Sequence, residues 1–318
     1  MLLNFLGYAT IALKIKNTIM KKTFLFAVAV MTILLSTFII KGEILKKPVQ
    51  TEKMKVTASF YPLAFLAEEI GGDKVQVLNL TPAGAEPHEY EPTSRDIAEM
   101  ENSSVLIMNG LGLEPWYENI KSNINPQKTF LLVAGEGLGD VKTKDPHIWL
   151  SPALMNTMAK KIEKTFEKAD PENEVYYRTN LQALSEKLLI LDGEYRQGLV
   201  NCAQKNIITS HTAFGYMTKS YGLVQVSIAG LSPDEEPSPK TMGDVVVFAK
   251  KNNVKYIFFE SLASPKLSQT IANETGAKTL VLNPLEGLTK QQLSQGKNYL
   301  SVMRENLVNL QIALSCPK

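Results

Sequence analysis

The chain has 318 residues, of which 44% are hydrophobic and 21% charged, a composition typical of a globular protein with one large or two mid-sized domains. Its formal net charge of +2 conceals an uneven distribution: the first 55 residues carry nine lysines and two acidic residues, which leaves a net charge of about −5 on residues 56–318. A mildly acidic body gives no reason to expect nucleic-acid binding, so we expect no nucleic-acid partner.

Residues 1–53 are predicted to form a signal or anchor segment and a tether. Met20, Lys21 and Lys22 make a basic start, and the uncharged apolar residues 23–40 follow, which is the layout of a secretory signal. As a helix, this run would extend roughly 27 Å, close to the ~30 Å hydrocarbon core of a bilayer. We expect Met20 to be the start, because the residues before it add only a second, weaker apolar stretch. No clear cleavage site follows, which favours residues 23–40 as an uncleaved anchor over a removed signal peptide, for a body that works outside the cytoplasm, in a periplasm or on the outer face of the cell membrane.

Residues 54–170 are predicted to form an N-terminal α/β lobe. Runs rich in β-forming residues alternate with amphipathic helical stretches, and Thr93 or Ser94 is the expected N-cap of one helix. The expected strands are 55–60, 74–80, 104–110 and 129–135, and the expected helices are 62–72, 92–103, 114–123 and 151–170. Such alternation predicts a mainly parallel sheet.

A long helix over residues 171–200, with Pro171 at its first turn, is predicted to link this lobe to a second α/β lobe over residues 201–318. The expected strands of the second lobe are 206–210, 223–229, 254–260 and 277–283, and its expected helices are 214–221, 239–252, 265–275 and 292–314. The predicted fold class is therefore α/β, with two lobes of mainly parallel sheet joined by one long rigid helix.

The three histidines of the chain all follow predicted strands. His88 lies in a loop after residues 74–80, His147 lies after residues 129–135, and His211 comes directly after residues 206–210. Ligands of open α/β sheets bind at the carboxyl ends of the strands. Three converging imidazoles suit a borderline-soft divalent cation, and Zn²⁺ with a fourth ligand is favoured. We therefore expect the three histidines to converge on one metal site.

Two glutamates are candidates for the fourth ligand, and a water molecule is the remaining alternative. Glu260 and Glu286 each lie just past a predicted strand of the second lobe. Glu286 is preferred because a turn with Pro284 and Gly287 can push its side chain into the cleft. Glu260 is expected to hold the second ring nitrogen of a histidine. Three further acidic residues of the first loop are expected to face solvent: Glu86, Glu89 and Glu91.

Four segments resemble those of the zinc and manganese solute-binding proteins of ABC importers: AGAEPHEYEPTSRDI, DPHIWLSP, SHTAFGYMTKSYGL and LNPLEGLT. The resemblance covers residues 56–316. It implies two α/β lobes on a rigid helix, a metal held between them by His88, His147, His211 and Glu286, and delivery of the ion to a membrane permease powered by a cytoplasmic ATPase. It also implies a disulfide between Cys202 and Cys316, because zinc-type members carry a similar pair.

The histidine at position 211 favours zinc, because manganese-selective relatives tend to have a carboxylate there. Two features depart from the resemblance: no histidine-rich loop separates the first two ligand segments, and no cysteine near the apolar run can accept a lipid. We expect a monomer without enzymatic activity. The alternatives left open are manganese or iron as cargo, a zinc hydrolase that uses the three histidines, and a surface adhesin in which the metal is structural.

Overall fold

The computed structural model describes residues 2–44, 52–139 and 142–317. The chain divides into two compact units, Met1–Glu52 and Lys53–Lys318, and each is described by itself. Among its described residues, the first unit contains one helix, α1 (Leu2–Ile44). Its segment Leu13–Ser36 has a mean hydropathy of 1.8 and no buried portion, and by length and composition alone it is able to cross a membrane.

The second unit begins with a four-stranded sheet in the order β2-β1-β3-β4, and every neighbouring pair in it is parallel. Its strands are β1 (Met54–Ala58), β2 (Val75–Asn79), β3 (Val105–Met108) and β4 (Phe130–Val133). The helices between them are α2 (Tyr61–Gly71), α3 (Ser94–Glu101) and α4 (Tyr117–Ile120). Thr93 caps α3 in a reciprocal capping box with Asp96, which confirms the first of the two predicted caps.

A second four-stranded parallel sheet has the equivalent order, β6-β5-β7-β8. Its strands are β5 (Asn206–Thr209), β6 (Val224–Ser227), β7 (Tyr256–Phe259) and β8 (Lys278–Val281). The intervening helices are α7 (Gly215–Tyr221), α8 (Pro239–Lys251) and α9 (Lys266–Thr275). The predicted fold class, two parallel-sheet lobes, is therefore confirmed.

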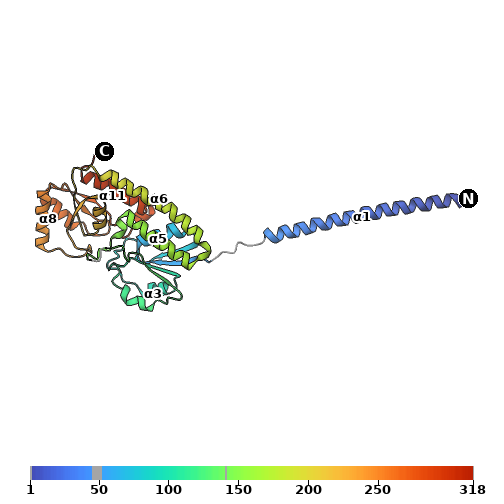
Figure 1. Ribbon diagram of the computed structural model, residues 1–318, viewed down its shortest axis with the longest axis horizontal. Coiled ribbons are helices and arrows are strands. Elements are labelled where there is room, and N and C mark those ends of the chain that lie inside the picture. The colour runs from blue at the N-terminus through green and yellow to red at the C-terminus, as the bar shows by residue number, and fades with distance from the viewer. Residues whose placement is uncertain (1, 45–51, 140–141, 318) are drawn as a thin grey trace. The chain divides into compact units, whose positions relative to one another are not determined.

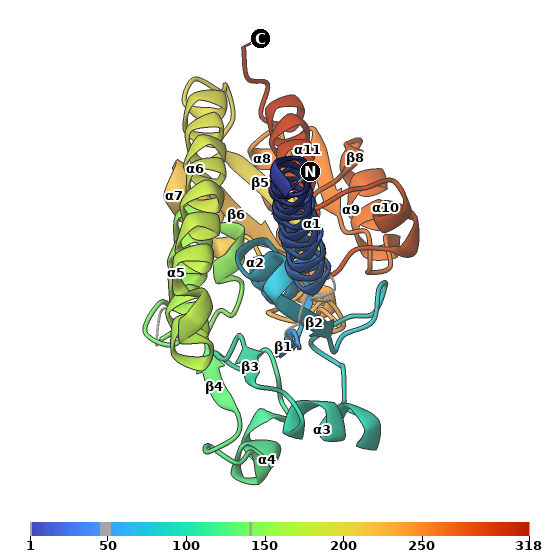
Figure 2. The same ribbon diagram turned by 90° about the vertical axis from the view of Figure 1, so that its right-hand side faces the viewer.

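Two long helices, α5 (Pro152–Ala169) and α6 (Glu174–Leu199), pack against each other and overlap in the view of Figure 2. Figure 1 shows α6 extending from the first lobe to the end of the second, where it meets α11 (Tyr299–Ala313). One hydrophobic core runs from β1 through both helices to α11, and Phe166, Leu188 and Tyr195 are fully buried within it. Burial of apolar residues from both lobes against one helix keeps the lobes in a fixed arrangement.

Two predicted helix boundaries were wrong. The final helix, expected over residues 292–314, is two helices, α10 (Lys290–Ser294) and α11, because Gly296 has a φ of 71° and Asn298 starts α11 as its N-cap. The helix expected over residues 114–123 is reduced to α4 and the 3-10 turn Lys121–Asn123. Pro171 opens the linking helical run as predicted, in a 3-10 turn (Pro171–Asn173) that leads directly into α6.

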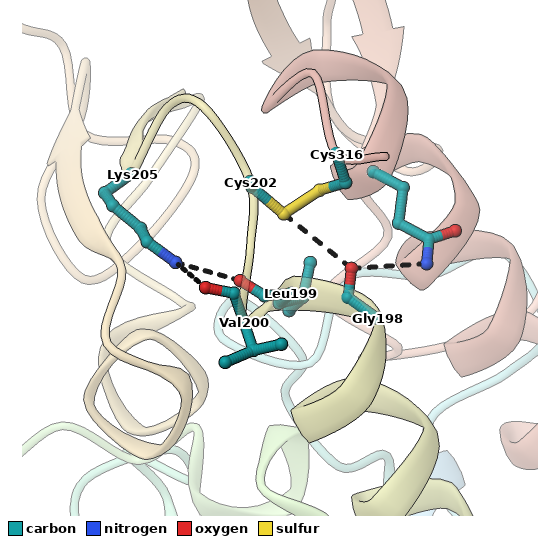
Figure 3. The surroundings of a disulfide bond; sticks show 7 residues. Gly198, Leu199, Val200, Cys202, Lys205 and Cys316 are labelled. Carbon is teal, nitrogen blue, oxygen red and sulfur yellow. Dashed lines mark hydrogen bonds between the residues drawn. A yellow bond between two sulfur atoms is a disulfide. The ribbon is translucent and has the colours of Figure 1, made fainter. Parts of the chain in front are cut away.

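A disulfide joins Cys202 and Cys316, as the resemblance implies. The two cysteines follow the ends of α6 and α11 (Figure 3). Gly198, in the last turn of α6, accepts a hydrogen bond of 3.3 Å from Nε2 of Gln311. The bridge therefore fixes the terminal turn of the chain to the helix that both lobes share.

Candidate metal site

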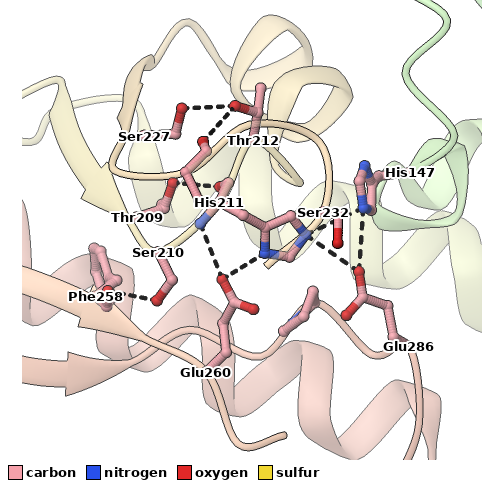
Figure 4. A network of polar contacts seen from close by, with 12 residues as sticks. His147, Thr209, Ser210, His211, Thr212, Ser227, Ser232, Phe258, Glu260 and Glu286 are labelled. Atoms are coloured by element: carbon pink, nitrogen blue, oxygen red, sulfur yellow. Dashed lines mark hydrogen bonds and ion pairs between the residues drawn. The ribbon is translucent and has the colours of Figure 1, made fainter. Parts of the chain in front are cut away.

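The structure brings together all four side chains predicted to hold a metal. His88 lies on the loop after β2, His147 follows β4, His211 lies two residues beyond β5, and Glu286 follows β8. One ligand atom from each residue falls within 4.8 Å of the others. The strands of each sheet are parallel, so the loops that follow them gather at one edge of each lobe. Figure 4 shows His147 reaching Glu286 and His211 from the other lobe.

The three imidazoles all present Nε2 to one carboxylate oxygen. Oε1 of Glu286 lies 3.3 Å from Nε2 of His88, 3.1 Å from Nε2 of His147 and 3.2 Å from Nε2 of His211. The side chains of His147, His211 and Glu286 are at most 1% exposed, whereas that of His88 is 9% exposed. The site is therefore closed except on the side of the His88 loop.

The turn that carries Glu286 is held by hydrogen bonds from both lobes. Leu285 has a φ of 58°, a left-handed conformation that its N–H stabilises by donating to Oδ1 of Asn283 at 2.7 Å. Nε1 of Trp149 donates to the carbonyl of Pro284 at 2.7 Å. Asn306 of α11 also pairs with both backbone groups of Asn283. These contacts compensate for the strained backbone and direct Glu286 into the site.

Two further carboxylates hold the buried histidines by their second ring nitrogen. Oε1 of Glu260 lies 2.7 Å from Nδ1 of His211, which matches the role expected for Glu260. Oδ1 of Asp145 lies 2.8 Å from Nδ1 of His147. Sequence reasoning missed Asp145, although an aspartate two residues before a histidine, with a proline between, was a usable signal. Both contacts place the proton on Nδ1 and leave the Nε2 lone pair for a cation.

The ionisable side chains of the cluster shift one another's pKa values. Burial raises the pKa of Glu286, but the charge of His211 and hydrogen bonds from the imidazoles outweigh it and bring this pKa well below the ordinary value. Burial lowers the pKa of His211, yet the charges of Glu286 and Glu260 raise it well above the ordinary value. Hydrogen bonds to Asp145 and Glu286 likewise overcome burial and raise the pKa of His147. The raised pKa values of His147 and His211 favour protonation of these two rings, so a cation that binds their Nε2 atoms must displace the protons there.

The acidic loop beside His88 differs in part from expectation. Glu89 and Glu91 are exposed, as predicted, but Glu86 is only partly exposed and its Oε1 accepts the backbone N–H of His88 at 3.2 Å. Burial and the neighbouring charge of Glu286 raise the pKa of Glu86 to about 9. The prediction that Glu86 faces solvent was wrong, because the loop folds it toward the site.

The residues present fit a divalent cation. Oε2 of Glu286 is buried and has no hydrogen-bonding partner among the described residues, which is costly for a carboxylate unless an ion compensates for it. Three imidazole nitrogens and one carboxylate oxygen are ligands that zinc accepts in a tetrahedral arrangement. Among the described residues, no other group of histidines, cysteines and carboxylates is clustered in this way.

Fold and site together define a two-lobed solute-binding protein with a cluster suited to a divalent cation between its lobes. Residues 56–313 match the family described as zinc-uptake complex component A, periplasmic (ZnuA). The chain belongs to this family.

Relatives named for zinc uptake or zinc binding are similar over most of the body. The high-affinity zinc uptake system protein ZnuA of Bacillus subtilis is 38% identical over 83% of this chain and 88% of its own length. The zinc-binding protein AdcA of Streptococcus pyogenes is 37% identical over 82% of this chain, which spans only 56% of AdcA. The Zn(II)-bound ZnuA-like domain of Streptococcus pneumoniae AdcA superimposes with a TM-score of 0.75 at 36% identity, over 82% of this chain and 99% of that domain.

Proposed function

We propose that this chain is the extracytoplasmic solute-binding protein of a zinc importer. Its body captures one Zn²⁺ through His88, His147, His211 and Glu286 and delivers it to a membrane permease driven by a cytoplasmic ATPase. The observation that carries the proposal is the convergence of three imidazole Nε2 atoms on one buried carboxylate oxygen, with contributions from both lobes. Zinc is the cargo and not a resident cofactor.

The proposal extends to the organisation of the chain. Residues 1–53 export and anchor it, residues 54–170 and 201–318 form the lobes, and residues 171–200 link them, with the body acting as a monomer. The apolar helix α1 supports an anchor by its length and composition. A rigid link suits a carrier, because such a protein must stay folded when it is empty, unlike a protein whose fold depends on a structural metal.

A hydrolytic role is disfavoured by the positions of the two glutamates. Oε1 of Glu260 already accepts from Nδ1 and from the backbone N–H of His211, so this carboxylate is not directed at a reacting water. Glu286 reaches all three imidazoles and takes the fourth position, where a hydrolase keeps a water molecule. We propose that the protein carries zinc and does not catalyse a reaction.

A chelator-competition titration of residues 53–318 with zinc and manganese tests this function. We expect one zinc per chain, bound far more tightly than manganese, and a loss of more than about 100-fold in zinc affinity for His211→Ala, since even a change in the outer shell costs 10- to 100-fold. Asn273→Ala on α9 is the control and should bind zinc like the parent. Absence of stoichiometric zinc binding, or binding that is indifferent to His211, would refute the proposal.

A further inference from the structure

Asp145 holds His147 at two points with a single oxygen atom. Its Oδ1 accepts from the backbone N–H of His147 at 3.0 Å and lies 2.8 Å from Nδ1 of the same residue. Asp145 is only 7% exposed. A carboxylate that engages both the backbone and the ring of one histidine fixes the ring rotation as well as the tautomer.

The same two-point contact recurs at His211, although the elements involved are unrelated in sequence. Oε1 of Glu260 accepts from the backbone N–H of His211 at 3.3 Å and lies 2.7 Å from its Nδ1. His88 differs: Glu86 accepts its backbone N–H, and no carboxylate is found at its Nδ1 among the contacts of the described residues. The repetition at the two fully buried histidines indicates a requirement of the site and not a chance contact.

Asp145 is itself seated against the other lobe. The hydroxyl of Tyr216, at the start of α7, donates to the backbone carbonyl of Asp145 at 2.9 Å. Gly215 packs so closely that a Cβ atom added to it would lie 2.7 Å from Oδ2 of Asp145. The φ of Gly215 is not in the left-handed region, so glycine is needed here for space and not for backbone freedom.

We infer that Asp145 is a positioning residue whose carboxylate, seated on α7 of the second lobe, orients His147 for zinc. The inference rests on the proposed zinc site. It adds that the orientation of His147, a ligand from the first lobe, depends on the start of α7 in the second lobe. A change at the start of α7 that moves Asp145 therefore weakens zinc binding although no ligand is altered.

The discriminating variant is Gly215→Ala, which changes neither a ligand nor Asp145. The added methyl group must push the carboxylate away from its seat, while alanine suits a helix at least as well as glycine. Gly243→Ala in α8 is the matched control, because a Cβ there meets no atom within 4 Å. Asp145→Ala and Asp145→Asn complete the set, since asparagine keeps an oxygen acceptor and should rescue part of the loss.

Zinc affinity, melting temperature and the imidazole Nδ1 proton signals of the zinc-loaded chain from Lys53 to Lys318 are measured for each variant. We expect Gly215→Ala and Asp145→Ala to lose about 10- to 100-fold in zinc affinity. The Nδ1 proton of His147 should shift and exchange faster in both variants, while that of His211 stays unchanged. The melting temperature of Gly215→Ala should fall no further than that of Asp145→Ala, because both changes disturb the same contacts of His147.

Three outcomes separate the possibilities. Parental affinity and an unchanged His147 signal in Gly215→Ala would overturn the inference while the proposed function stands. An equal loss in Gly215→Ala and Gly243→Ala would overturn it as well, since helix composition would then explain the effect. A parent chain without stoichiometric zinc would refute the proposed function itself.

Discussion

At the scale of single residues, the two lobes differ at the ends of their first and third strands. A buried carboxylate fills this position in the first lobe, whereas residues of the metal site fill it in the second. Ser59 follows β1, and Asn109 follows β3. Oε1 of Glu114 accepts from the hydroxyl of Ser59 and the N–H of Asn109, and its Oε2 accepts from the N–H of Gly110 at 2.9 Å. In the second lobe, His211 and Glu260 follow the corresponding strands β5 and β7. The strand-end donors of the first lobe are thus satisfied within that lobe, and its two metal-site residues, His88 and His147, come instead from the loops after β2 and β4.

Glu114 makes stability depend on pH. Burial raises its pKa, although Ser59 and the backbone amides oppose the shift. Between the ordinary and the raised pKa, the folded chain holds a proton that the unfolded chain has lost. The free energy of unfolding therefore falls as the pH rises through that window.

The Glu114→Gln variant should lack this slope. It should also carry a constant cost of about 1–3 kcal/mol, because one amide donor loses its acceptor. Urea midpoints measured from pH 4 to pH 8 check the prediction, with the exposed Glu101→Gln as control. An identical pH slope in Glu114→Gln and the parent would contradict it.

At the scale of elements, α6 and α11 are bonded to each other, and α11 is bonded to the turn that leads to Glu286. Tyr195 of α6 donates its hydroxyl proton to the carbonyl of Met303 at 2.6 Å, and Arg304 pairs with Glu194. Asn306 of α11 holds the turn that precedes Glu286. Movement of α11 relative to α6 would therefore reach the metal cluster, and the Cys202–Cys316 disulfide closes this pair of helices at their shared end.

Replacing both cysteines by serine should lower the free energy of unfolding by about 2–5 kcal/mol, since the bridge closes a long loop. Zinc affinity should change by less than about threefold, because the hydrogen bonds around Asn283 and Trp149 remain. Urea unfolding and chelator competition measure the two effects, and reductant-treated parent is the control. A large loss of zinc affinity with little loss of stability would show that the bridge acts on the site and not on the fold.

At the scale of the whole molecule, the two lobes of the body have the same strand order and share one core through α5 and α6. We expect residues 53–318 to unfold in a single transition, because neither lobe buries its helix-facing residues without α6.

Zinc at 1,000 times its dissociation constant should add about 4 kcal/mol to the free energy of unfolding. Calorimetry checks both, and two separate transitions in the parent would contradict the shared core.

Sequence alone determined the α/β class, most element positions and the three histidines, because strand and helix periodicities and the residues that follow strands are local properties. It failed at Gly296 and Asn298, where a left-handed residue and a cap divide a helix that hydrophobic periodicity makes continuous. Tertiary structure alone decided that Glu86 turns inward and that Asp145 is seated on α7, and it brought Glu286, already the preferred fourth ligand, against all three imidazoles. These facts depend on contacts between segments up to about 200 residues apart, and only the packing of both lobes on α6 fixes such contacts.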